Sequence, residues 1–233
     1  MIDKNNPSNN HHVKWYSRWI AGFAIIAIPV FTLLFSFKQS PFQYTLSQMG
    51  NFFGWDHRLD FIIWGIITGA CFMVYIGYLF RRVNFRNKRA NVWLVLANVF
   101  LVLTVLTPSI KEIYPISTRL HFLYSGLFAL SLILTTSFFV QYLGEIDEKI
   151  SAWSLKWAQI IVGGSVVSLF IFGKTGIFEL FFLLSFTAFL IALSTWLRKE
   201  EFINLFQKYY NKYVKSLIKK PGTAQEDNEK GQA

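Results

Sequence analysis

The stretch FIIWGIITGACFMVYIGYLF (61–80) holds twenty consecutive residues without a charge. About 20 apolar residues in a helix are enough to cross the hydrocarbon core of a bilayer, so this stretch predicts a membrane span over 59–80. Five further blocks show the same character, over 17–37, 90–107, 120–143, 154–172 and 176–197. We therefore expect an all-α, polytopic membrane protein with six transmembrane helices in one bundle.

The composition agrees with these six blocks, which occupy most of the 233 residues. The chain is 53% hydrophobic and 15% charged, whereas a soluble domain carries about 25% charged residues. We expect a cytoplasmic N-terminal tail over 1–16 and a six-span transmembrane domain over 17–197. A basic amphipathic helix over 198–220 and a disordered tail over 221–233 are expected to follow. Gly65 and Gly69, four residues apart in the second span, predict close packing against another helix.

Lysine and arginine are distributed unevenly between the predicted connections. Eighteen of the 23 lie in or near the two tails and the connections after the second and fourth spans, and five lie on the opposite side. Because cytoplasmic connections carry the excess of positive charge, we expect a multi-pass protein of the cell membrane with both termini in the cytoplasm. The same asymmetry accounts for the net charge of +10 without a nucleic-acid partner.

The segment 198–220 has its own pattern of apolar residues. The apolar residues recur every three or four positions, so they share one face of a helix, and lysines lie on its other faces. The apolar residues are Phe202, Leu205, Phe206, Tyr209, Tyr213 and Leu217. This pattern is typical of a helix that lies on anionic lipids of the cytoplasmic leaflet. The alternative is a solvated helix that simply continues the sixth span.

Polar and ionisable residues collect where the second, fourth and sixth spans begin. These spans run in parallel, so the expected orientation places their first turns on the outer side of the membrane. Asp60 lies inside the apolar boundary, where a carboxylate needs a partner, and we expect that partner to be Arg119 or His121. The alternative is that such residues cap helices or lie among lipid headgroups. The candidate ligand-binding residues are Ser47, Asn51, His57, Arg58, Asp60, Arg119, His121 and Glu179.

No established catalytic motif occurs in the chain, since H-E-x-x-H, the P-loop and G-x-S-x-G are all absent. The single cysteine, Cys71, cannot form an internal disulfide. His57 and His121 with a nearby carboxylate would be enough ligands for zinc, and the two histidines could instead hold a haem. Because the ligand pattern is no tighter than this, we expect no metal site and no cofactor.

Two segments carry a resemblance to a known group of proteins. The first predicted outer loop contains YTLSQMGN (44–51), and HRLDFIIWGIITG (57–69) opens the second span. Together with the six-span layout, they resemble an uncharacterised group of six-helix bacterial membrane proteins, which is similar in layout to the eukaryotic Frag/DRAM/Sfk-like proteins. The resemblance implies a six-helix bundle without established catalytic activity and a shared loop element at Ser47 and Gly50. SQMG departs from the more usual form, which has an acidic residue before the glycine.

These observations lead to a functional hypothesis with one alternative. We expect a non-enzymatic membrane protein that binds a lipid, an amphiphile or a small solute in an outward-facing polar pocket, as a sensor, an accessory subunit or a carrier. The alternative is an intramembrane, metal-dependent hydrolase that acts on a lipid-linked substrate.

Overall fold

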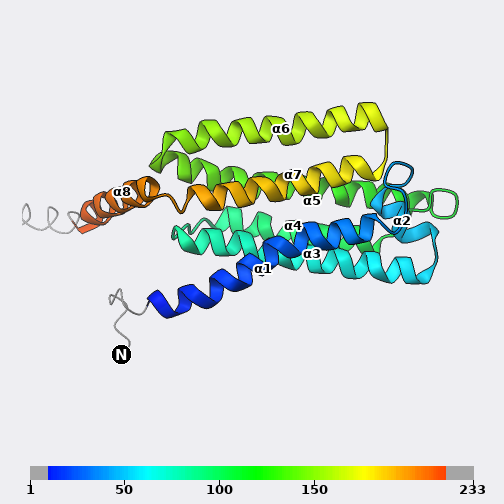
Figure 1. Ribbon diagram of the computed structural model, residues 1–233, viewed down its shortest axis with the longest axis horizontal. Helices are drawn as coiled ribbons and strands as arrows, with labels where there is room; N and C mark the ends of the chain where they lie inside the picture. The colour runs from blue at the N-terminus through cyan, green and yellow to red at the C-terminus, as the bar shows by residue number, and fades with distance from the viewer. Residues whose placement is uncertain (1–9, 219–233) are drawn as a thin grey trace, which may run out of the picture.

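The computed structural model describes residues 10–218, and over this range the chain is helical and contains no strand. Six of its helices are long and apolar enough to cross a membrane, and α2 and α8 are the two exceptions (Figure 1). The prediction of an all-helical protein with six candidate spans is therefore confirmed. The helices are α1 (Asn10–Ser36), α2 (Leu46–Phe52), α3 (Trp55–Arg82), α4 (Lys88–Leu106), α5 (Pro115–Ile146), α6 (Glu148–Phe172), α7 (Gly176–Trp196) and α8 (Glu200–Ile218).

The predicted span limits differ from the helix limits mainly at the polar ends. The largest difference is in α1, which begins at Asn10, inside the predicted tail 1–16, although its apolar part begins only at Tyr16. Backbone hydrogen bonds continue a helix past the last apolar residue, so hydropathy underestimates helix length. The predicted disordered tail 221–233 lies outside the described residues.

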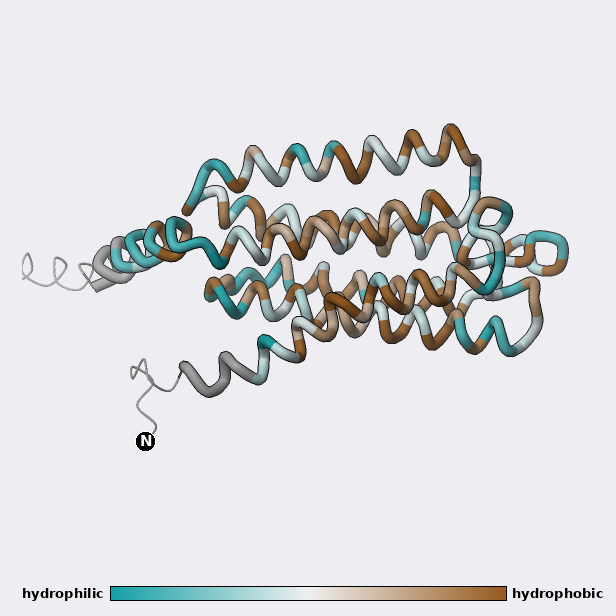
Figure 2. Tube along the Cα trace, viewed as in Figure 1, coloured by the Kyte–Doolittle hydropathy of each residue, from teal (hydrophilic) through white to brown (hydrophobic). Residues whose placement is uncertain are grey.

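Each long helix packs against the next one along the chain, and α7 also packs against α1. Large side chains with less than 2% of their surface exposed fill the space between them, among them Phe61, Phe72, Phe139, Leu132 and Leu193. Figure 2 shows hydrophobic residues along the long helices and hydrophilic residues gathered at their ends and on α8. This distribution is the one expected when the middle of each helix lies in hydrocarbon.

Glycines bring α3 and α4 close together, as the sequence predicts. A Cβ at Gly69 would lie 2.9 Å from the side-chain oxygen of Asn98, and a Cβ at Gly65 would overlap the side chain of Val105. Neither glycine can therefore carry a side chain unless the facing Asn98 or Val105 side chain shifts. This is the close backbone approach that small residues permit between membrane helices.

The alternating direction of the long helices gives the molecule two distinct ends. The start of α1, the connection between α3 and α4, and α8 lie at one end, and α2 lies at the other (Figure 1). We call the first the basic end because Arg18, Arg81 and Arg82 lie there, and we call the second the α2 end.

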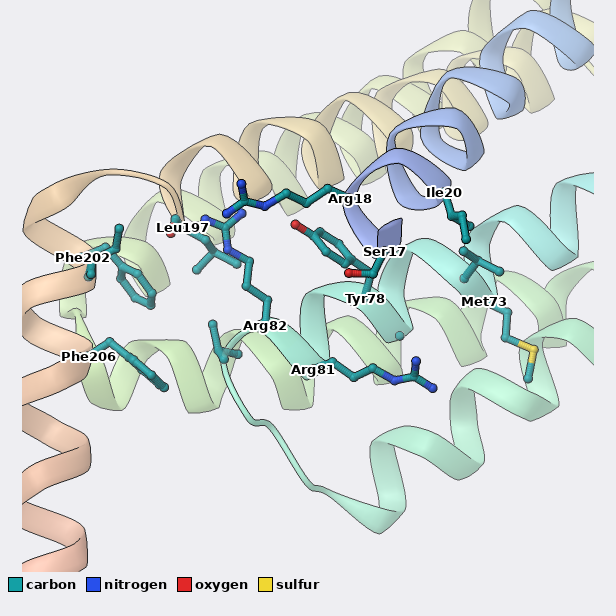
Figure 3. Close-up of a pocket in the computed structure, with 14 residues that line it drawn as sticks. Ser17, Arg18, Ile20, Met73, Tyr78, Arg81, Arg82, Leu197, Phe202 and Phe206 are labelled. Atoms are coloured by element: carbon teal, nitrogen blue, oxygen red, sulfur yellow. Dashed lines mark hydrogen bonds between the residues drawn. The ribbon is translucent and has the colours of Figure 1, made fainter. Parts of the chain in front are cut away.

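The helix α8 does not continue α7 in a straight line. α7 ends at Trp196, α8 begins at Glu200, and the two helices point in different directions (Figure 3). Phe202 of α8 is only 3% exposed, and the Tyr209 hydroxyl donates to Glu145 Oε2 of α5 at 3.1 Å. These contacts attach α8 to the basic end.

Candidate functional site

The loop at the α2 end contains a short helix that sequence patterning missed. Thr45 is the N-cap of α2: its hydroxyl accepts from Gln48 N at 3.1 Å, and the Gln48 side chain accepts from Thr45 N at 2.9 Å. This reciprocal pair is a capping box, which satisfies two backbone N–H groups that the helix leaves unpaired. The spacing Thr-x-x-Gln at 45–48 was a readable signal for this helix.

Glu179 joins the first turn of α7 to the first turn of α2. Its Oε2 accepts a hydrogen bond from Leu46 N at 2.6 Å. In return, Gly176 N donates to Tyr44 O at 2.9 Å, and Ile177 N donates to Pro41 O at 3.2 Å. Unpaired N–H groups at a helix N-terminus need acceptors. Glu179 of α7 therefore supplies an acceptor to the start of α2, and the carbonyls of Pro41 and Tyr44, which precede α2, supply acceptors to the start of α7.

Arg58 joins α2 to α3 and α4. Its Nη1 donates to Asn51 Oδ1 at 2.8 Å, and its Nη2 donates to Leu106 O at 2.6 Å. The Asn51 amide in turn donates to the carbonyl of Ser47, and the Ser47 hydroxyl lies 2.9 Å from the Thr45 hydroxyl. A guanidinium can hold two acceptors at once because its donors are fixed in one plane.

His121 joins α5 to the end of α4 at the same end of the molecule. Its ring is 3% exposed, and Nδ1 lies 2.9 Å from Thr104 O and 3.1 Å from Thr107 O at the end of α4. Because both partners are carbonyl oxygens, Nδ1 carries the proton and donates. The histidine thus donates to two carbonyls at the end of α4, where a helix has too few N–H groups to pair with every carbonyl.

Five of the eight predicted residues therefore make hydrogen bonds at the α2 end, to α2 or to the end of α4, and we call these bonds together the network at the α2 end; the other three residues lie outside it. The network contains Ser47, Asn51, Arg58, His121 and Glu179. His57 instead packs against the ring of Phe53, with ring centroids 5.6 Å apart, and Arg119 is exposed.

The prediction for the partner of Asp60 was wrong. Asp60 forms an ion pair with Lys38, from the connection after α1, and not with Arg119 or His121. The sequence reasoning considered only the starts of the parallel spans. The loop that precedes α2 brings Lys38 to the same level, and both side chains are about 40% exposed. Such an exposed pair contributes little to stability.

The polar side chains of the network at the α2 end have hydrogen-bond partners within the protein. None of the eight predicted residues lines the large cleft at the basic end or the smaller cavity of about 290 Å³ between α5, α6 and α7. Among the described residues no three His, Cys, Asp or Glu side chains are grouped so that they could hold a metal ion. Whether the eight residues bind a ligand stays a prediction, and the observed role of Arg58, His121 and Glu179 is to join helices.

A cleft of about 790 Å³ lies at the basic end, and we call it the basic cleft. Side chains from α1, α3, α8 and the connections beside them line it. They are Ser17, Arg18, Ile20, Met73, Val74, Gly77, Tyr78, Arg81, Arg82, Val83, Leu197, Phe202, Ile203 and Phe206. Three of these described lining residues are arginines and none is acidic, so the cleft has a positive charge that its own walls do not neutralise.

Arg82 is the most constrained of the three arginines. Its Nη2 donates to Leu197 O at 3.1 Å, whereas its Nη1 is buried and has no hydrogen-bond partner. Figure 3 shows the Arg18 and Arg82 side chains directed toward the same part of the cleft, beside the Tyr78 hydroxyl, and Arg81 directed away from them. In the sequence these arginines indicate only the orientation of the chain, because nothing in their spacing indicates that α1 and α3 meet here.

Neither the family models, the curated proteins nor the solved structures contain a match to this chain. The resemblance to six-helix bacterial membrane proteins therefore remains a prediction carried by the residues 44–51 and 57–69.

Proposed function

We propose that this multi-pass membrane protein binds an anionic lipid or amphiphile in the basic cleft, as a sensor, an accessory subunit or a carrier. The observation that carries the proposal is the buried, unpartnered Nη1 of Arg82. A buried donor without a partner costs free energy, more so when it is charged. An anionic oxygen placed in the cleft would supply the missing acceptor.

The apolar part of the cleft supports an amphiphile rather than a small inorganic anion. Ile20 of α1 and Met73 of α3 lie on the side of the cleft away from Arg82, and both are more than 40% exposed (Figure 3). At a rise of 1.5 Å per residue, Met73 lies roughly 13 Å from Arg82 along the axis of α3, toward the start of that helix. The cleft therefore offers a charged part for a headgroup and an apolar wall for a chain.

The α2 end supports the same function less well. The Asn51, Arg58 and Glu179 side chains already have partners within the protein, so a ligand would have to displace them. A metal-dependent hydrolase is also less well supported, since the described residues contain no group of three His, Cys, Asp or Glu side chains that could hold its metal ion. For these reasons the proposal places the ligand at the basic end.

We further propose that the basic end faces the cytoplasm of the cell, with both termini on that side. The asymmetry of 18 against 5 positive residues supports this orientation. The cytoplasmic leaflet is also the one that carries anionic lipids, which would interact with the lysines of α8.

The orientation can be tested by thiol labelling of intact cells. In a Cys71→Ser background, single cysteines replace Arg86 or Glu112, which are exposed at the basic end and the α2 end respectively. We expect an impermeant maleimide to label the cysteine at position 112 and to label position 86 only after the cells are permeabilised. The reverse pattern would overturn the proposed orientation.

Lipid binding can be tested with purified protein by native mass spectrometry. We expect the protein to retain phosphatidylglycerol in preference to phosphatidylcholine, and Arg82→Gln and Arg18→Gln to lose most of that preference. Arg18 is exposed, so its variant is expected to keep the fold even if Arg82→Gln, which loses the bond to Leu197, unfolds more easily.

The matched control is Arg86→Gln. It removes the same charge from the basic end, but Arg86 is exposed, bonds to Asn84 and does not line the cleft. Equal retention of the neutral and anionic lipids, or an unchanged preference in Arg18→Gln, would refute the binding proposal.

A further inference from the structure

Two arginines of the basic cleft point toward the same part of it, and their arrangement indicates which headgroup the proposed lipid carries. Arg18 and Arg82 come from different helices, yet Arg18 and also Arg198 lie near enough to repel the charge of Arg82. The Tyr78 hydroxyl lies beside the Arg82 guanidinium (Figure 3). Arg18, Arg82 and the Tyr78 hydroxyl therefore face the same part of the cleft, and Arg198, which does not line it, adds positive charge nearby.

No ion pair joins these arginines to a carboxylate within the described residues. The single ion pair found there joins Lys38 to Asp60 at the α2 end, and no acidic group is among those that act on Arg82. Like charges held together at a partly buried position are costly unless an opposite charge joins them. The more negative the ligand, the more of this repulsion it offsets.

We infer that the basic cleft selects a phosphomonoester, with two negative charges and three terminal oxygens, over a phosphodiester, with one charge and two. This inference rests on the proposed function and names its ligand class. Arg82 Nη1, the Arg18 guanidinium and the Tyr78 hydroxyl are donors from three separate side chains, one more than the two terminal oxygens of a diester. A terminal phosphate accommodates donors from both arginines and the hydroxyl on separate oxygens.

The inference predicts a preference between lipids that share the same chains. Native mass spectrometry of the full-length protein with dioleoyl phosphatidate and dioleoyl phosphatidylglycerol compares the monoester with the diester. We expect phosphatidate to be retained at least about tenfold more tightly at pH 8, the ratio that one additional charge-assisted hydrogen bond provides. Arg18→Gln is expected to remove most of this ratio, and Arg86→Gln to leave it unchanged.

The pH dependence supplies an independent readout. The second ionisation of a phosphomonoester occurs near pH 6, so the preference should shrink as the pH falls from 8 to 5. The described lining of the cleft contains no His, Asp, Glu or Cys, and its titratable groups are Tyr78 and the three arginines, with Arg198 beside them. A preference that does not change over this range would contradict the inference.

The outcomes separate this inference from the proposed function. If phosphatidate and phosphatidylglycerol are retained equally, and both more than phosphatidylcholine, the preference for a phosphomonoester is refuted and the proposal of anionic lipid binding stands. Retention of neither above phosphatidylcholine would overturn both.

Competition with soluble phosphates identifies the source of the headgroup. Because the cleft has an apolar wall, we expect glycerol 3-phosphate or inorganic phosphate at the same concentration not to displace phosphatidate. Displacement by glycerol 3-phosphate, with the same loss in Arg18→Gln, would support the phosphomonoester and assign it to a soluble compound.

Discussion

Replacing Gly50 with alanine is expected to destabilise the protein by about 1–3 kcal/mol, the usual cost of overpacking a tight contact. A Cβ at Gly50 would lie 2.5 Å from the Cβ of Phe61. The Phe61 side chain cannot rotate away from this contact, because its Cβ is attached to the backbone of α3. Phe61 is also 2% exposed and packs against the rings of Phe35 and Trp64. The substitution must therefore shift α2 away from α3.

The measurement is thermal unfolding in detergent, followed through the thiol of Cys71. This is the single cysteine of the chain, and it is free and buried, so a fluorogenic maleimide reports its exposure on unfolding. For a chain of this size, each kcal/mol corresponds to roughly 2–4 °C in melting temperature. Gly126→Ala is the matched control, since nothing lies within 4 Å of the added Cβ. A melting temperature for Gly50→Ala equal to that of the control would contradict the packing of α2 described above.

The second large effect is expected for Arg58→Gln. Hydrogen bonds to a charged group contribute about 1.5–3 kcal/mol, and this substitution removes the donors to both Asn51 and Leu106. Arg58→Lys should recover little of the loss, because an ammonium group does not reproduce the planar pair of donors. The same thermal assay measures both variants.

Arg119→Gln provides the control for Arg58→Gln. It removes one arginine from the same end of the molecule, but Arg119 is exposed and outside the network, so its effect should stay within about 0.5 kcal/mol. The substitution Asn51→Ala should lower the stability of Arg58→Gln by less than it lowers the stability of the wild-type protein, because the effects of substituting two directly bonded residues are not additive. Strictly additive losses would mean that the bond between Asn51 and Arg58 contributes nothing.

The sequence was sufficient to predict the six candidate spans, and the reason is that membrane insertion depends on local hydropathy. A block such as 61–80 must be buried in hydrocarbon or in other helices whatever surrounds it. The same local reasoning explains the failure at α2. Seven residues are too few to show a helical period, and the capping box at Thr45 and Gln48 was the remaining signal.

Polar pairing required the tertiary structure. The sequence placed Arg58, His121 and Glu179 at one end of the molecule, but their partners are mostly backbone atoms: Leu106 O, Thr104 O and Leu46 N. Every residue carries such atoms, so no pattern of side chains identifies the ones that will be left unpaired at a helix end. Asp60 shows the same limit, because its partner Lys38 comes from a loop whose path hydropathy does not predict.

The basic cleft shows most clearly which features the sequence predicts and which depend on the tertiary structure. The abundance of arginine at one end follows from composition and topology alone, since the positive residues can be counted along the chain. Their convergence depends on the packing of α1 beside α3 and on the turn that carries Phe202 and Phe206 of α8 into the wall. These contacts join residues more than 50 positions apart, and long-range packing of this kind leaves no periodic trace in the sequence.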